Sequence, residues 1–285
     1  MATSAARPLA RWLTWVAAVA AAFAWPLAEL FRFAAGSGLY SHILLMPLIC
    51  GYLVWLKRDS LPAADPPART WAVVPGAAAA GLLGWRALAG TALVADDALA
   101  LTTGAFVCAV WSVSLLFLGR ATVKALLFPL AMLVFLVPMP VAVRDGVEMF
   151  LQHASAGAAE LLFRLTGLTF LRLGLLFELP TVTLEVAPEC SGIRSTLVLF
   201  ITSLLAGYLF LRSGWKRAVV VAVVIPLGIF RNALRIWVLA ELCVRVGPQM
   251  LHSPIHQQGG PIFFAASLLP LMGLLIWLWR TEHTP

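Results

Sequence analysis

Long apolar runs separated by short polar or basic segments set the pattern of this chain. A helix of about 20 apolar residues crosses the hydrocarbon core of a bilayer, and eight runs approach or exceed that length. The pattern predicts an all-α integral membrane protein of about eight transmembrane helices, forming one polytopic domain over residues 1–285. The predicted spans are 11–33, 41–56, 71–90, 98–118, 123–143, 191–211, 218–246 and 261–279.

Two segments between the fifth and sixth spans depart from this pattern. In residues 144–168 the apolar positions recur at helical spacing among charged ones, which predicts an amphipathic helix on the outer membrane face or on the bundle. Residues 176–188 alternate apolar and polar positions, which predicts a short extended or hairpin element before the sixth helix. The seventh span is long enough to tilt or to break near Pro226.

Composition supports a membrane protein and argues against a nucleic-acid partner. Of the 285 residues, 61% are hydrophobic and 12% are charged, about half the charged fraction of a typical soluble domain. The net charge is +7, but the basic residues are scattered between apolar runs and form no basic stripe. The four cysteines form no CxxC pair, so neither a zinc site nor a disulfide framework is indicated.

The basic clusters predict the orientation, because Lys and Arg concentrate in cytoplasmic loops. With the N-terminus inside, 11 of the 20 basic residues fall inside, including all three lysines. The C-terminus is then also cytoplasmic, and Cys190, Arg235 and His256 share the outer face. The inside set is Arg7, Arg11, Lys57, Arg58, Arg69, Arg120, Lys124, Arg212, Lys216, Arg217 and Arg280.

Cys190 is the candidate nucleophile. It lies between Glu189 and Ser191, where the predicted extended element meets the sixth helix. The unpaired N–H groups at the start of a helix favour the thiolate form of a nearby cysteine, and Arg194, about one turn on, would add to this effect. The alternative is an inert buried cysteine.

Arg231 and Arg235 lie four residues apart in the seventh span and share one helix face, with Asn232 between them. An arginine at membrane depth is unfavourable by several kcal/mol unless it faces a polar cavity or a partner. Both are therefore candidate functional residues. The alternative is a structural ion pair with Glu241 or Glu189.

His252 and His256 lie in the outer loop that enters the eighth span. A histidine can act as a base near neutral pH, and the alternative is an ordinary surface-loop histidine. No Glu follows the first His as in HExxH and no third ligand is evident, so neither a metal nor another cofactor is expected. Together, Cys190, a histidine and an arginine fit a nucleophile, a base and a group that stabilises an oxyanion.

Four segments, in this order along the chain, resemble the exosortase/archaeosortase family of membrane-embedded cysteine transpeptidases. Ile43 follows His42 where the family has a glycine, and Pro261 follows Gly260 where a tryptophan is common. The matching segments are Tyr40-Ser41-His42 with the apolar run to Arg58, Glu189-Cys190-Ser191-Gly192-Ile193-Arg194, the NxxRI motif Asn232 to Ile236, and the HxxxGxxFF motif from His256 through Gly260 to Phe263-Phe264.

The resemblance implies a catalytic set of Cys190 as nucleophile, Arg235 as essential arginine and His256 as base. Possible assisting residues are Arg194, Arg231, Asn232, Glu189 and His252. It also implies a setting in the bacterial inner membrane, with the active site on the periplasmic face.

The clients implied are exported proteins with a C-terminal sorting signal of the PEP-CTERM kind, which combines a short motif, a transmembrane helix and a basic tail. Cleavage would form a thioester at Cys190, and the product would pass to an acceptor that the sequence does not identify, in contact with membrane lipid. Two alternatives stay open. One is a cysteine protease that uses water as the acceptor, and the other is a non-catalytic transporter or assembly factor for exopolysaccharide or envelope export.

Overall fold

The computed structural model describes residues 6–62, 66–188, 191–252 and 260–283. The chain divides into two compact units, Met1–Val143 and Arg144–Pro285. Among the described residues, five helices are long and apolar enough to cross a membrane, and the number rises to seven if each of two bent helix pairs counts as one span. The protein is therefore a mainly helical multi-pass membrane protein, while the count of eight spans stays a prediction.

Large apolar side chains lie exposed on the helices of both units. A soluble protein rarely exposes so many, because contiguous apolar surface promotes association in water. An apolar surface of this kind suits contact with lipid, which agrees with the predicted class of membrane protein. Examples, each exposed by 60% or more, are Trp25, Leu48, Val73, Val74, Trp85, Leu88, Trp215, Ile262, Leu269 and Trp277.

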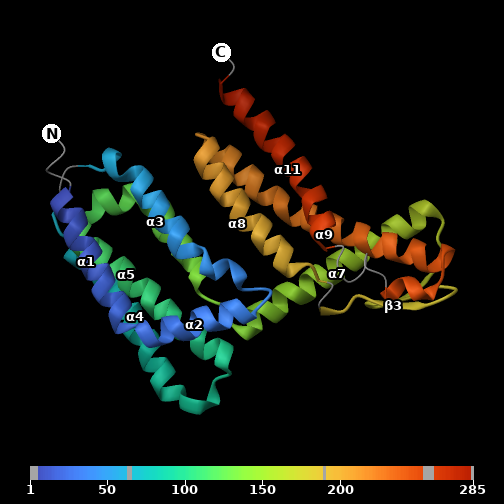
Figure 1. Ribbon diagram of the computed structural model, residues 1–285, viewed down its shortest axis with the longest axis horizontal. Helices are drawn as coiled ribbons and strands as arrows, with labels where there is room; N and C mark the ends of the chain where they lie inside the picture. The colour runs from blue at the N-terminus through green and yellow to red at the C-terminus, as the bar shows by residue number, and fades with distance from the viewer. Residues whose placement is uncertain (1–5, 63–65, 189–190, 253–259, 284–285) are drawn as a thin grey trace. The chain divides into compact units, whose positions relative to one another are not determined.

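The first unit contains helices and short 3-10 turns (Figure 1). Its α-helices are α1 (Ala6–Ala22), α2 (Ala24–Gly36), α3 (Met46–Lys57), α4 (Arg69–Ala89), α5 (Ala95–Ala125) and α6 (Leu127–Met132). Its 3-10 turns are η1 (Ser41–Leu44), η2 (Arg58–Ser60), η3 (Gly90–Ala92) and η4 (Leu133–Leu136).

Three predicted spans in this unit are not single straight helices. The run 11–33 bends by 75° between α1 and α2, next to Pro26, which has no N–H to continue the helical ladder. The run 41–56 contains η1 and then α3, whose 12 residues reach only about 18 Å. The run 123–143 is divided among the end of α5, α6, η4 and the first residues of the next helix, which begins at Val141 after Pro138 and Pro140.

Small and polar residues hold the first unit together. The hydroxyl of Ser112 on α5 donates to the carbonyl of Ala72 on α4 at 2.9 Å, and a Cβ on Gly76 would lie 3.2 Å from that hydroxyl. The indole N–H of Trp12 on α1 donates to Ser114 Oγ on α5 at 2.9 Å. These contacts join α1, α4 and α5 by matching a small residue or a hydroxyl with a close helix approach.

The second unit begins with α7 (Val141–Thr166), which covers the predicted amphipathic segment. Its buried residues recur at three- and four-residue intervals, as a helix with one packed face requires. A three-stranded antiparallel sheet follows in the order β1 (Leu171–Leu173), β2 (Leu176–Glu178) and β3 (Thr183–Glu185). The last two strands fall within 176–188, where an extended element is predicted, and β1 precedes that range.

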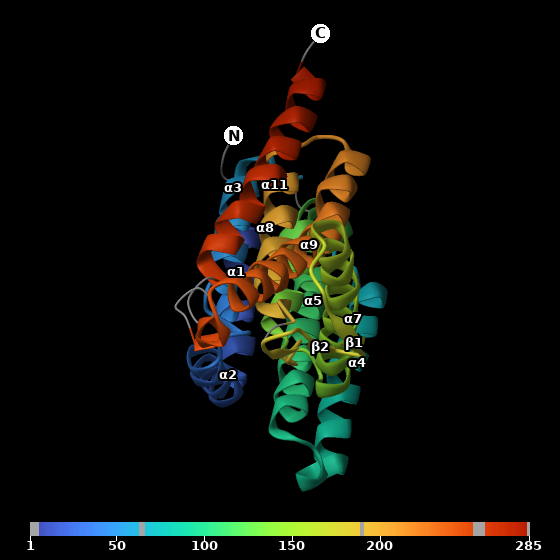
Figure 2. The ribbon, with the colours of Figure 1, turned by 90° about the vertical axis from the view of Figure 1, so that its right-hand side faces the viewer.

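Three long helices complete the second unit, and they lie side by side (Figures 1 and 2). They are α8 (Ile193–Phe210), α9 (Gly214–Arg245) and α11 (Gly260–His283), with the 3-10 turn η6 (Pro248–His252) between the last two. The helix α9 continues through Pro226 without ending there. Its C-terminal half packs with α7 and the sheet around one apolar cluster that contains Phe163, Phe177, Leu184, Ile236 and Leu239.

Polar contacts fasten α11 to the loop between α8 and α9. The carboxylate of Glu282 accepts the backbone N–H groups of Arg212 and Ser213 at 2.8 and 2.9 Å. The buried ammonium group of Lys216 donates to Thr281 Oγ1 at 2.9 Å and lies 3.8 Å from the Glu282 carboxylate. This end of the three-helix layer is therefore fixed at the ends of α8 and α11 and the start of α9.

The helices α8 and α9 approach each other tightly at Gly228. A Cβ on Gly228 would lie 2.7 Å from Thr196 Oγ1. We expect Gly228→Ala to lower the stability of the protein by about 1–3 kcal/mol, because an overpacked helix contact must shift. Thermal unfolding in detergent measures this loss.

A compensating change and a control sharpen this test. Adding Thr196→Ala to Gly228→Ala removes the clashing hydroxyl and should recover most of the lost unfolding temperature. Gly273→Ala, which adds a Cβ in open space on α11, should be neutral or slightly stabilising. Equal losses at positions 228 and 273 would contradict a tight contact at Gly228.

Candidate active site

The start of α8 is built around a left-handed glycine. Gly192 is the N-cap of α8, with φ of 75° and ψ of 11°, a conformation that glycine adopts without the Cβ penalty of other residues. Its carbonyl accepts hydrogen bonds from Ser195 Oγ and from the Thr196 backbone N–H, both at 3.0 Å. These contacts hold the first turn of α8 in a defined geometry.

The predicted nucleophile belongs to the segment just before this turn. Cys190 and Glu189 lie outside the described residues. On either side of them, the Ser191 backbone N–H donates to the Pro188 carbonyl at 3.0 Å. Ser191 is buried, and its hydroxyl donates to Glu148 Oε1 on α7 at 3.3 Å. Ser191, the residue before the N-cap of α8, is therefore held to α7.

Arg231 on α9 reaches the same turn from the neighbouring helix. Its side chain is only 7% exposed, and Nη2 donates to Ser195 Oγ at 2.5 Å, to the Gly192 carbonyl at 3.4 Å and to Thr196 Oγ1 at 3.4 Å. Among the described residues, Nη1 has no hydrogen-bond partner and no carboxylate lies within ion-pair distance. Arg231 is thus a buried cation that is held by neutral oxygen atoms at the start of α8.

Gly192 also lies in close contact with the Arg231 side chain of α9. A Cβ on Gly192 would lie 3.2 Å from Arg231 Nη2 and 3.5 Å from the Asn232 Cγ. The missing side chain therefore makes room for the guanidinium and for the amide that follows it on α9. Both the φ angle and the local crowding favour glycine at this position.

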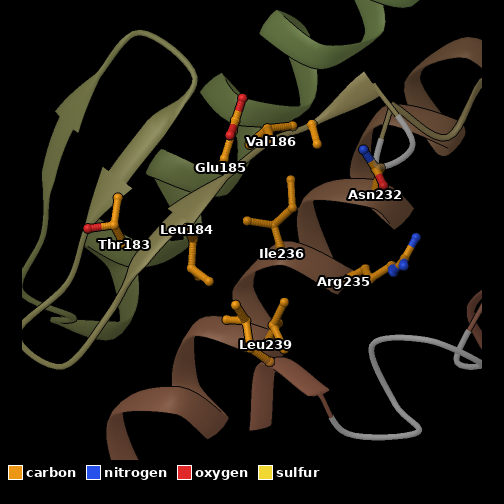
Figure 3. A pocket seen from close by; sticks show the side chains of 10 residues that line it. Thr183, Leu184, Glu185, Val186, Asn232, Arg235, Ile236 and Leu239 are labelled. Carbon is orange, nitrogen blue, oxygen red and sulfur yellow. The ribbon is translucent and has the colours of Figure 1, made fainter. Parts of the chain in front are cut away.

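Arg235 and Asn232 line a cavity of about 240 Å³ in the second unit. Figure 3 shows these two side chains near one another on α9, with Thr183 at the far end of the lining. The opposite wall is the strand β3 and the residues that continue it toward Cys190. The full lining is Thr183, Leu184, Glu185, Val186, Ala187, Asn232, Arg235, Ile236, Leu239 and Leu251.

The two arginines that the sequence singled out therefore have different surroundings. Arg231 is buried against α8, whereas Arg235 is half-buried and lines the cavity. Glu241, one of the two partners considered for a structural ion pair, is paired with Arg245 one turn along α9 at 2.6 Å. For Arg231, the ion pair considered with Glu241 is replaced by hydroxyl and carbonyl acceptors.

The remaining predicted residues are only partly placed. Arg194 is exposed on the first turn of α8. His252 ends the turn η6, and its side chain is not described. His256 lies outside the described residues. The proximity of Cys190, Arg235 and His256 to one another thus stays a prediction.

Two supporting residues were not found by sequence reasoning. Glu148 contacts Ser191, and the buried Gln152 donates to the Val186 carbonyl at 2.9 Å. Both lie on α7, so this helix positions the strand and the turn on either side of 187–190. Each contact joins residues more than thirty positions apart, and no local motif indicates such a pair. Polar residues on the packed face of an amphipathic helix were the only available signal.

The fold and the site define a multi-pass helical membrane protein. One arginine, Arg231, is buried at the start of α8, and a second, Arg235, lines a cavity. A comparison with protein-family models matches the transmembrane exosortase family over residues 34–273. The chain therefore belongs to the transmembrane exosortase family, which confirms the resemblance read from its motifs. No curated protein and no solved structure matched in the other two comparisons.

Gly192 offers a direct test of this geometry. We expect Gly192→Ala to destabilise the protein, because the left-handed conformation is unfavourable by about 1–2 kcal/mol for a residue with a Cβ and because that Cβ would crowd Arg231. Gly174→Ala is the matched control, since Gly174 also has a positive φ, of 64°, but has open space around its Cβ position.

The expected result is a larger fall in the detergent unfolding temperature for Gly192→Ala than for Gly174→Ala. If the two variants lose the same stability, only the backbone angle matters at position 192. The crowding by Arg231 would then play no part.

Proposed function

We propose that this chain is a sorting transpeptidase that cleaves exported proteins near a C-terminal sorting signal. The observation that carries the proposal is the cavity lined by Arg235 and Asn232, whose other wall is the strand that leads into the Cys190 segment. Family membership supports the same reaction class. A cation and an amide can stabilise the oxyanion of an acyl transfer, and the proposed nucleophile follows β3 in the sequence.

The proposed reaction has two acyl-transfer steps. The Cys190 thiolate attacks the carbonyl carbon of a client peptide bond, and Arg235 stabilises the oxyanion that forms. As the C–N bond breaks, His256, which has taken the thiol proton, passes it to the leaving amine, and a thioester remains on Cys190. An acceptor amine then attacks the thioester and gives a proton to His256, the C–S bond breaks, and His256 returns that proton to the sulfur.

The orientation predicted from the basic loops supports an outer-face reaction. With the predicted eight spans and both termini in the cytoplasm, the loops that carry Cys190 and His256 would lie on the periplasmic side of a bacterial inner membrane, where exported clients would arrive. The client is proposed to carry a short motif, a transmembrane helix and a basic tail. Its acceptor is an amine whose carrier is not identified.

The first prediction concerns Cys190. We expect Cys190→Ala to leave the protein folded and the client unprocessed, because the proposed acyl-enzyme forms on the Cys190 thiol. Co-expression with candidate C-terminal signals, followed by mass spectrometry of the wild type, should detect a Cys190-linked client fragment and its transferred product.

The outcome also separates the alternatives. A product that ends in a free carboxylate identifies a protease that uses water. Normal client processing by Cys190→Ala would refute the transpeptidase and favour a transporter or assembly factor.

The second prediction concerns Arg231, which we propose to be a positioning residue. A buried charge that no opposite charge compensates is unfavourable, and an apolar residue of similar length removes that cost. We therefore expect Arg231→Met to unfold at the same or a higher temperature than the wild type. Client processing should nevertheless fall at least tenfold, because the α8 turn after Cys190 loses the hydrogen bonds that hold it.

Arg231→Lys is the matched variant, since it keeps the charge but loses the forked donor. It should process the client between the rates of Arg231→Met and the wild type. Wild-type processing by Arg231→Met would show that the guanidinium does not position the turn.

A further inference from the structure

Among the described residues, no strand pairs with the outer edge of β3 in the second unit. The strand β3 is at the edge of the order β1-β2-β3, and Leu184 is opposite Phe177 in the antiparallel register. Two hydrogen bonds show which residues of this segment face β2. The Val186 N–H donates to the Leu175 carbonyl at 3.0 Å, and the Leu179 N–H donates to the Val182 carbonyl at 2.9 Å. The backbone groups of alternate residues in an antiparallel strand point to opposite sides.

The backbone N–H and C=O groups of Thr183 and Glu185 therefore point away from β2. Within the described part of the chain, none of these four groups has a hydrogen-bond partner. A row of unpaired donors and acceptors on an edge strand is a template for another extended chain. Several peptide-binding domains use an exposed sheet edge to bind an extended peptide by strand addition.

The surroundings of this edge fit a peptide. Leu184, Ile236 and Leu239 form an apolar part of the cavity lining, and each is less than 10% exposed. Arg235 and Asn232 supply polar groups at one end of the cavity (Figure 3). A strand laid along β3 would thus find backbone partners, apolar contacts and a cation in one place.

The edge is also continuous with the segment that carries the proposed nucleophile. Cys190 follows Glu185 by five residues, which is at most about 17 Å of extended chain. A peptide paired with β3 would therefore run toward the chain that bears Cys190. Lipid headgroups and glycans do not present alternating N–H and C=O groups at a two-residue repeat, whereas an extended peptide does.

We propose that β3 binds the client by strand addition. The occupant is the extended segment of an exported protein that directly precedes its C-terminal transmembrane helix, and it pairs with the outward N–H and C=O groups of Thr183 and Glu185. The inference rests on the proposed function for the identity of the client. The pairing itself is a separate claim about how the client is held.

Site-specific photo-crosslinking tests the location of the peptide. The probe is p-benzoylphenylalanine at Thr183 of the full chain, in the Cys190→Ala background and in the membranes of the native host. The same probe at Leu171, exposed on β1 at the opposite edge of the sheet, is the control.

Mass spectrometry should map the Thr183 adducts to residues just before the C-terminal hydrophobic helix of exported proteins, with at least tenfold fewer such adducts from Leu171. Equal yields at the two edges, adducts scattered over unrelated sequences, or no adduct at Thr183 would overturn the proposal.

Proline substitution tests the backbone hydrogen bonds, because proline has no N–H and is tolerated on an edge strand. Thr183→Pro and Glu185→Pro should each process the client at least tenfold more slowly than Thr183→Ala and Glu185→Ala. The comparison at one position isolates the N–H, since both variants lack the original side chain. Equal rates for the proline and alanine variants would overturn strand addition, and if a proline variant does not fold, the crosslinking result decides.

These results distinguish the two proposals. If the wild type forms the Cys190 thioester but the edge variants have no effect, the transpeptidase stands and strand addition fails. If Thr183 captures the client segment but no thioester forms on the wild type, the edge binds peptide and the transpeptidase fails.

Discussion

A guanidinium group within a helix bundle is tolerated only where polar atoms surround it, and Arg231 meets this requirement at the first turn of α8. Among the described residues, its hydrogen-bond acceptors are the carbonyl of Gly192 and the hydroxyls of Ser195 and Thr196. All of them belong to one turn, so the position of α9 along α8 is fixed by this contact. The absence of a side chain at Gly192 and at Gly228 allows the two helices to come close enough for it to form.

The contact between Arg231 and the first turn of α8 explains why two arginines on one helix face have different surroundings. A spacing of four residues separates Arg231 and Arg235 by about 6 Å along the axis. Because Arg231 is bound to the α8 turn, Arg235 is carried one turn farther, to the lining of the cavity. Asn232 follows Arg231 directly and contributes to both places, since it lies near the Gly192 Cβ position and also lines the cavity.

The sequence predicted the class of protein and the motif residues, but not how helices are interrupted or which distant residues meet. Hydropathy averages over a window, so it cannot distinguish a straight span from α1 and α2, which meet at a 75° bend. It likewise counted 41–56 as a span, although the regular helix α3 has only 12 residues. Motif spacing gave Arg235 and Arg231 different predicted roles, because a register such as NxxRI is local, and these roles stay a prediction. The contact between Glu148 and Ser191 is non-local, and its two residues are ordinary in their own surroundings.

The sheet raises a question that a purely helical membrane protein does not. An unpaired backbone N–H or C=O group in hydrocarbon lacks any partner, so an open sheet edge is excluded from the lipid interior. The edge of β3 must therefore face water or a protein-lined cavity, and the exposed side chains of Thr183 and Glu185 agree with a wet boundary. The side chains of Leu184 and Val186 must instead be kept from water, and they belong to the apolar cluster with Phe163 and Phe177. This division anchors one face of the strand in the core while its edge remains available, and it does so on the chain that leads to Cys190.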